Sequence, residues 1–185
     1  QWVSNEQCGQ GRYVYSNGDV YDGEWQSSLQ WGHGTMTFAD GSTYVGEYVE
    51  DNAHGTGTFV DAATGDEYTG QWYDGVREGV GVVTYGNGDV FEGVFEDDKK
   101  HGPGKFVFKN GDVLIGEWVN DVHQLSMLNS PPEFIKEMMA TPELFKEESI
   151  PVASPERNMS RSSSSAHLEP RPDDIYEGDE VNGKK

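Results

Sequence analysis

The chain has 185 residues, of which 33 are acidic and 13 are basic, and its formal net charge at pH 7 is −20. Nucleic-acid phosphates and anionic lipid surfaces would repel such a chain, which disfavours non-specific binding to either of them. No run of about 18 apolar residues occurs, so we expect no membrane-spanning segment. Cys8 is the single cysteine, which excludes a disulfide within the chain and favours a reducing compartment.

Glycine and aromatic residues are concentrated in the first two thirds of the sequence. Residues 1–125 contain 22 of the 24 glycines and 19 of the 22 aromatic residues, whereas most of the prolines follow residue 125. We predict three regions on this basis. They are a repeat array over 1–125, a linker with a short amphipathic helix over 126–148, and a disordered tail rich in Ser, Pro and acidic residues over 149–185.

The glycine-rich region repeats with a period of 23 residues, once lengthened to 24. Each unit begins with a large residue. A glycine follows two positions later, and an aromatic residue follows two positions after the glycine. The five copies are Tyr21–Trp25, Tyr44–Tyr48, Tyr68–Trp72, Phe91–Phe95 and Leu114–Trp118. Trp2 lies 23 residues before Trp25, so residue 1 falls inside a repeat. We therefore expect the sequence to be a piece of a longer protein in which further repeats precede it.

Alternation within each unit predicts β-strands. In the first full copy Tyr21, Gly23 and Trp25 point to one side, and Asp22 and Glu24 point to the other. A second block follows each of the first four copies, and in it a Gly-x-Gly pair alternates with large residues in the same way, as in Gly32, Gly34, Met36 and Phe38. Two strands per repeat is the simplest interpretation of this pattern.

Glycine has two roles in this interpretation. Asp-Gly or Asn-Gly pairs, such as Asn17-Gly18 and Asn87-Gly88, follow the second strand of most units and predict tight hairpins, because glycine adopts positive φ at low cost. Glycines inside the strands have no Cβ, so an aromatic ring can lie flat across them. The predicted fold is all-β: an elongated single-layer antiparallel meander in which neighbouring repeats stabilise one another.

The repeated residues resemble a known family. A Tyr-x-Gly-Glu-Trp strand, a His-Gly-x-Gly block and a closing Asp-Gly or Asn-Gly at this period resemble the MORN (membrane occupation and recognition nexus) repeat, in about five copies over residues 1 to about 120. The resemblance implies a binding or positioning module, with any catalysis in another domain, and a cytoplasmic, cytoskeletal or ciliary setting. It also implies an alternative, a regulatory or membrane-targeting domain of a larger enzyme or membrane-junction protein that binds phospholipid.

The residue pattern argues against catalysis, a metal site and a cofactor. His54 and His101 are two repeats apart, which separates them by roughly 19 Å along the sheet and excludes a shared metal ion. Glu24 and Glu47 recur at one position per repeat, about 10 Å apart. With nothing to separate the pKa values of the two carboxyls, we interpret them as part of a solvated acidic face.

The repeated aromatic and acidic positions form the predicted partner-binding site. An open single-layer sheet cannot bury every ring, so we expect several rings to line an exposed groove, although all of them could instead be core. Acidic flanks favour a protein partner with a basic amphipathic helix or extended segment. The predicted contact residues are Tyr21, Glu24, Trp25, Tyr44, Glu47, Tyr48, Tyr68, Trp72, Phe91, Phe95 and Trp118.

The linker carries a helix-start signal. Ser130 precedes two prolines and Glu133, and apolar residues follow at helical spacing. Two interpretations remain open for the segment from Phe134 to Phe145. It forms transient helices in a linker, or it docks in cis on the repeat sheet and covers part of the aromatic face.

Overall fold

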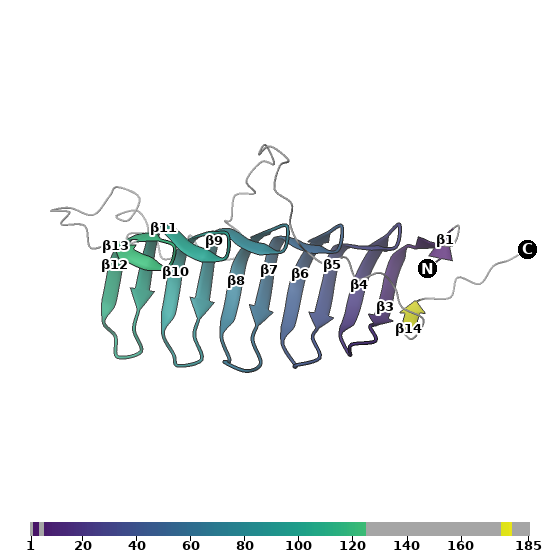
Figure 1. The fold of residues 1–185 in the computed structure, drawn as a ribbon, viewed down its shortest axis with the longest axis horizontal. Coiled ribbons are helices and arrows are strands. Elements are labelled where there is room, and N and C mark those ends of the chain that lie inside the picture. The colour runs from purple at the N-terminus through teal and green to yellow at the C-terminus, as the bar shows by residue number, and fades with distance from the viewer. Residues whose placement is uncertain (1, 4–5, 125–174, 179–185) are drawn as a thin grey trace, which may run out of the picture.

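The computed structural model describes residues 2–3, 6–124 and 175–178 of the chain. Twelve strands form one open antiparallel sheet, and two short strands form a separate hairpin beside it. From β3 to β13 the strand order in the sheet follows the order in the sequence, and β14 is added outside β3. Figure 1 shows these strands side by side along the long axis of the molecule. The predicted all-β single-layer meander is confirmed.

The strands come in pairs that follow the repeat. Shorter strands carry the Tyr-x-Gly motif and longer ones carry the Gly-x-Gly pair. The strands are β1 (Trp2–Val3), β2 (Glu6–Gln7), β3 (Gly9–Val14), β4 (Val20–Gln26), β5 (Leu29–Thr37), β6 (Thr43–Val49), β7 (Asn52–Val60), β8 (Glu67–Tyr73), β9 (Val76–Thr84), β10 (Val90–Glu96), β11 (Lys99–Val107), β12 (Val113–Val119), β13 (Val122–Gln124) and β14 (Ile175–Gly178).

One regional prediction lies outside the described residues, and another is wrong for four residues. The helix expected within 126–148 and the docking of Phe134 to Phe145 lie outside the described residues. The tail expected to be disordered over 149–185 contains β14, so that prediction is wrong for Ile175–Gly178.

Each long strand contains a bulge that bends it. Gly23 faces Gly34 and Trp25 faces Gln30, so one residue of β4 stands opposite three residues of β5 between these pairs. A glycine with positive φ lies in the bulge, at +64° for Gly32, and equivalent register shifts recur in the next three repeats. Bulges of this kind bend the strand that carries them. The hairpin ends therefore fold over at the upper edge of the sheet in Figure 1.

The two edges of the sheet use different turns. At the lower edge in Figure 1, Gly18 has a φ of +97° and its N–H donates to the Tyr15 carbonyl at 2.9 Å, which closes the turn that the Asn-Gly pair predicts. At the upper edge, two-residue turns have positive φ at both positions, as in Ser27 (+50°) and Ser28 (+66°). Such values at both positions are typical of type I′ hairpins.

Acidic residues in the turns connect neighbouring repeats. At the upper edge the Gln30 N–H donates to Asp51 Oδ1 at 2.7 Å, and at the lower edge the Ala39 N–H donates to Asp19 Oδ1 at 2.8 Å. The same bond recurs along both edges. Its further pairs are Arg77 with Asp98, Lys100 with Asp121, Gly86 with Asp66, and Lys109 with Asp89.

Facing glycines run across the sheet beneath the aromatic rings. Gly46 faces both Gly34 and Gly57, and the Tyr44 ring lies over Gly46 and Gly57. A Cβ added to Gly57 would approach the Tyr44 Cζ to 2.6 Å. Gly57 has no positive φ, so glycine is required there for space alone. This arrangement confirms the packing role predicted for the strand glycines.

Gly57→Ala should lower the free energy of unfolding by about 2 to 3 kcal/mol, because the new methyl group displaces the Tyr44 ring. Gly111→Ala is the matched control. It has a φ of +93° but nothing within 4 Å of an added Cβ, and it should cost about 1 kcal/mol from backbone strain alone. Chemical denaturation followed by tryptophan fluorescence measures both. An equal or smaller loss at Gly57 would contradict the packing role.

Candidate functional site

The nine predicted aromatic residues form one continuous ladder of ring contacts, which we call the aromatic ladder. Successive ring centroids are 5.1 to 5.5 Å apart with interplanar angles of 78° to 87°, the edge-to-face geometry that aromatic pairs prefer. Contacts within a repeat alternate with contacts between repeats. The order along the ladder is Trp25, Tyr21, Tyr48, Tyr44, Trp72, Tyr68, Phe95, Phe91 and Trp118.

The aromatic ladder is almost entirely buried. Tyr21 and Phe91 are 0% exposed, Trp25 is 6% exposed, and Trp72 alone among the nine is half-buried. The expectation that several of these rings line an exposed groove is therefore wrong. The sheet is a single layer, but the bent hairpins supply a second set of side chains that covers the rings.

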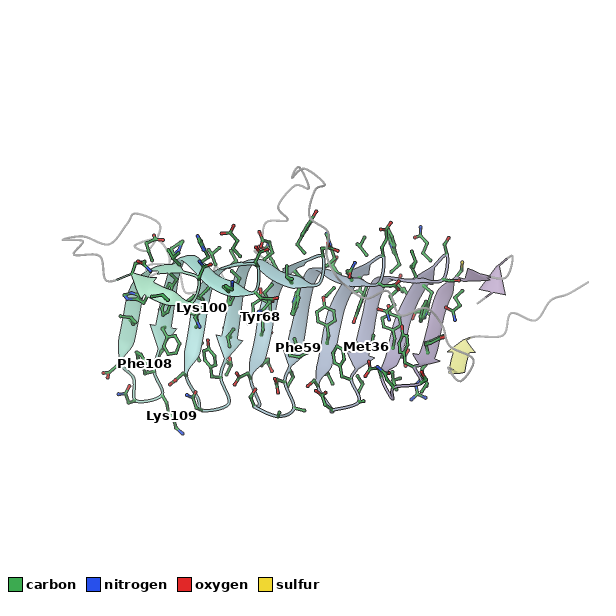
Figure 2. The ribbon with its side chains drawn as sticks, in the orientation of Figure 1. Met36, Phe59, Tyr68, Lys100, Phe108 and Lys109 are labelled. Atoms are coloured by element: carbon green, nitrogen blue, oxygen red, sulfur yellow. The ribbon has the colours of Figure 1, made fainter. Side chains whose placement is uncertain are left out.

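Polar and charged side chains from the hairpin ends make this cover. The Lys100 Nζ lies 5.6 Å from the centre of the Phe91 ring and 5.7 Å from that of Trp118, and it donates to the Tyr85 hydroxyl at 3.0 Å. At the equivalent position one repeat earlier, the Arg77 guanidinium lies 5.2 Å from the centre of the Phe95 ring. These are cation–π distances. Figure 2 shows the Lys100 side chain near the upper edge of the sheet.

The ladder tyrosines are neutral hydrogen-bond donors. The Tyr21 hydroxyl donates to the Glu24 carbonyl at 3.0 Å, and the Tyr44 hydroxyl donates to the Glu47 carbonyl at 3.1 Å. Burial, reinforced by the nearby Glu24 carboxylate, raises the pKa of Tyr21 far above its ordinary value, and burial also raises the pKa of Tyr44 and Tyr48. These side chains stay protonated at neutral pH, and the hydroxyls of Tyr21 and Tyr44 hold the backbone carbonyls of Glu24 and Glu47.

Glu24 and Glu47 bind backbone amides of the bulges. Glu24 Oε1 accepts the His33 N–H at 3.2 Å, and Glu47 Oε1 accepts both the Thr56 N–H at 2.9 Å and the Thr56 hydroxyl at 2.8 Å. Each carboxylate therefore satisfies donors that the bulge removes from the strand ladder. Both side chains are partly exposed, so the predicted solvated acidic face stays a prediction, and the structure adds a second role for them in holding the bend.

A second row of large side chains lies on the same face and stays partly exposed. We call it the apolar row. Met36 faces Tyr21 and Tyr44 across the strands, so the row borders the aromatic ladder, and Phe108 is 40% exposed. Figure 2 shows Met36, Phe59 and Phe108 on the lower part of the sheet. The row consists of Tyr15, Met36, Phe38, Phe59, Tyr85, Phe106 and Phe108.

Sequence reasoning did not assign the apolar row to the site. The alternation after each Gly-x-Gly pair places these residues on the ladder face, so the signal was present. What alternation does not show is which of two adjacent rows the bent hairpins cover. The structure buries the first row and leaves most of the second half-buried, although Tyr13 and Val83, at the positions equivalent to Met36, are buried.

The described residues form neither a metal site nor a membrane-spanning helix. Within 2–3, 6–124 and 175–178, no three His, Cys, Asp or Glu side chains gather where they could hold a metal ion. The same part of the chain contains no helix with the length and apolar character needed to cross a membrane.

A single antiparallel sheet of repeated hairpins with a shared ladder of rings defines the class of β-repeat proteins that stack one unit on the next. The sequence profile described as "MORN repeat" matches residues 1–20, 21–43, 44–63, 68–90 and 91–113, more than half of the sequence. The chain belongs to the MORN repeat family, which confirms the resemblance. A search of curated proteins found no match.

Two solved structures from Drosophila melanogaster are similar at a distance. One is the TCP domain of SAS-4 (dCPAP) in complex with a proline-rich motif of Ana2 (dSTIL), with 16% identity over 59% of each chain and a TM-score of 0.43. This chain thus matches less than two thirds of that domain's length. The other is the TCP10c domain of Sas-4, with 14% identity over 63% of this chain and 89% of the other and a TM-score of 0.33. Likeness at this level does not bear on function.

Glu47→Gln should leave the free energy of unfolding nearly unchanged, whereas Glu47→Ala should lower it by about 1 kcal/mol. The amide oxygen of Gln still accepts a backbone N–H, and the third repeat already uses it, since Gln71 Oε1 accepts the Val80 N–H at 2.9 Å. Chemical denaturation of the two variants side by side measures the difference. Equal losses in both would show that the negative charge, not the hydrogen bond, is what the bend needs.

Proposed function

We propose that the repeat array is a non-catalytic protein-binding module whose ladder face takes a basic amphipathic helix of a partner protein. The observation that carries the proposal is the apolar row, a set of large side chains that remains partly exposed along a face bordered by acidic turns. Aromatic residues contribute strongly to protein interfaces, and a buried row beside them gives a rigid base for contact.

The spacing of the row suits a helix lying along the sheet. Equivalent residues, such as Tyr15 and Phe38, recur every two strands, which is about 10 Å. A helix returns to the same face every seven residues, a rise of about 10.5 Å. A partner helix with apolar residues at that interval could place side chains against Tyr15, Phe38, Tyr85 and Phe108, and a basic residue against Asp61 at the equivalent position between them.

Charge supports a basic partner. Residues 1–125 contain 21 acidic and 6 basic residues, a net charge of −15. Several carboxylates at the turns are exposed on both sides of the row, including Asp40 and Asp112 at the lower edge and Glu50, Asp97 and Asp98 at the upper edge. Such an arrangement speeds association with a cationic segment and makes binding sensitive to salt.

The aromatic ladder has a supporting part in this proposal. Its rings set the position of the apolar row, and Trp72 is its one half-buried member. Direct contact between the partner and the other ladder residues stays a prediction, as does a cytoplasmic, cytoskeletal or ciliary setting.

The test uses the full chain and labelled peptides in fluorescence anisotropy. An amphipathic helical peptide of Leu and Lys should bind, more weakly as salt rises, and the corresponding peptide of Leu and Glu should not. The double variant Phe38→Ser, Phe108→Ser should weaken binding by about tenfold or more, because it removes two anchors of the row. Val45→Ser is the control, because Val45 is 53% exposed and alternates with the buried Tyr44, on the opposite face of the sheet.

Binding to lipid vesicles, measured alongside binding to the peptides, tests the alternative function. If the Lys peptide does not bind while vesicles bind more tightly as their anionic phospholipid content increases, the protein-binding proposal fails. Phospholipid binding, the alternative that the family resemblance implies, would then replace it. Equal loss of peptide binding in the Val45 control would also contradict the assignment of the ladder face.

A further inference from the structure

The outermost strand of the sheet comes from the far end of the sequence. β14 pairs antiparallel with β3, on the side of β3 that faces away from the array. Figure 1 shows β14 at the end of the sheet where β1 also lies. The paired residues are Ile175 with Val14, Tyr176 with Tyr13, Glu177 with Arg12, and Gly178 with Gly11.

The sequence of β14 copies the start of a repeat. Ile175–Gly178 reads Ile-Tyr-Glu-Gly, which follows the pattern of Val-Tyr-Asp-Gly at 20–23 and Val-Phe-Glu-Gly at 90–93. The likeness to a repeat ends at the glycine. When the two sequences are aligned, Glu180 stands where the first full repeat has the ladder residue Trp25. The segment is therefore a Tyr-x-Gly strand without its following aromatic residue.

The register of β14 is also that of a repeat. Gly178 faces Gly11 in the way that Gly23 faces Gly34, and Tyr176 faces Tyr13 at the position equivalent to Tyr21 and Met36. Gly178 thereby continues a single row of facing glycines across all the strands from β14 to β12. The row is Gly178, Gly11, Gly23, Gly34, Gly46, Gly57, Gly70, Gly81, Gly93, Gly104 and Gly116.

The β1–β2 hairpin provides the other half of the same unit. Trp2 pairs with Gln7 as Trp25 pairs with Gln30 in the next repeat. In that repeat one continuous strand, β4, carries both Tyr21 and Trp25. Here the two parts of the strand come from opposite ends of the sequence, Trp2–Val3 and Ile175–Gly178.

We propose that the outer edge of β3 is a specific acceptor for a Tyr-x-Gly strand, and that Ile175–Gly178 of the same chain occupies it wherever no repeat strand directly precedes Trp2. An unpaired edge strand offers a row of free N–H and C=O groups, and adding a strand satisfies them. Specificity comes from the glycine row. In the array a Cβ on Gly46 would approach the Gly57 Cα to 2.6 Å, so a strand facing Gly11 in register needs glycine at this position.

The same chain can reach this edge. Fifty residues separate Gln124 and Ile175, with a contour length of about 165 Å, whereas eleven strands span only about 50 Å. Binding within one chain then proceeds at an effective concentration of the order of millimolar, well above that of a second copy in dilute solution. The occupant is therefore the chain's own segment, and exchange with another copy is the competing outcome.

Amide hydrogen exchange measured by NMR on the full chain tests the proposal. Alternate amides of β3 point toward β4 and toward β14. The double variant Tyr176→Pro, Glu177→Pro should make the β3 amides that face β14 exchange about tenfold faster or more, with the β4-facing amides unchanged. Val181→Pro, Asn182→Pro, outside the paired residues, is the control. Unchanged exchange at the β14-facing amides, or an equal change in the control, would overturn the proposal.

A designed competitor tests the specificity of the edge. Extending the chain before Gln1 with a copy of Val20–Gly23 places a Tyr-x-Gly strand in register with Trp2. It should displace β14, so that the amides of 175–178 lose protection while β3 keeps its own. The same four residues in reverse order should not do so. A native chain that sediments as a dimer and becomes a monomer in the Tyr176→Pro, Glu177→Pro variant would assign the strand to a second copy and overturn the proposal.

Discussion

The structure depends on one contact, an aromatic ring lying flat over a pair of facing glycines. Tyr44 over Gly46 and Gly57 is a typical example, and its counterparts recur along the array. Because each ring also contacts a ring of the neighbouring repeat, the units share one core and cannot be stable separately. The glycine row, the aromatic ladder and the 23-residue period are therefore consequences of the same packing requirement.

The bend in each long strand allows a single-layer sheet to have a core. At Gly32 and its equivalents the bulge turns the hairpin over the rings, and carboxylate or amide oxygens such as Glu47 Oε1 satisfy the backbone donors that the bulge frees. Side chains such as Lys100 then cover the rings from above. Covering the first row in this way leaves the second row, ending at Phe108, as the apolar surface that the proposed function uses.

Much of the architecture could be predicted from the sequence. The period, the strand alternation and the Asn-Gly turns gave the meander, because each depends on local patterns in the chain. The burial of the ladder could not be predicted, since it requires knowing that two extra residues around Gly32 form a bulge. The upper turns carry no Asn-Gly signal, as Ser27-Ser28 shows. β14 was missed because four residues within a tail rich in Ser, Pro and acidic residues are too short a pattern to stand out.

The central claim is that ring contacts couple one repeat to the next. A double-mutant cycle with Tyr68→Leu and Phe95→Leu, whose rings are 5.1 Å apart in adjacent repeats, measures this coupling directly. Tyr21 and Phe95, which are not neighbours in the ladder, give the reference cycle. We predict a coupling of about 0.5 to 1.5 kcal/mol for the first pair and less than about 0.5 kcal/mol for the second. Equal couplings in the two cycles would contradict a ladder built from specific ring contacts.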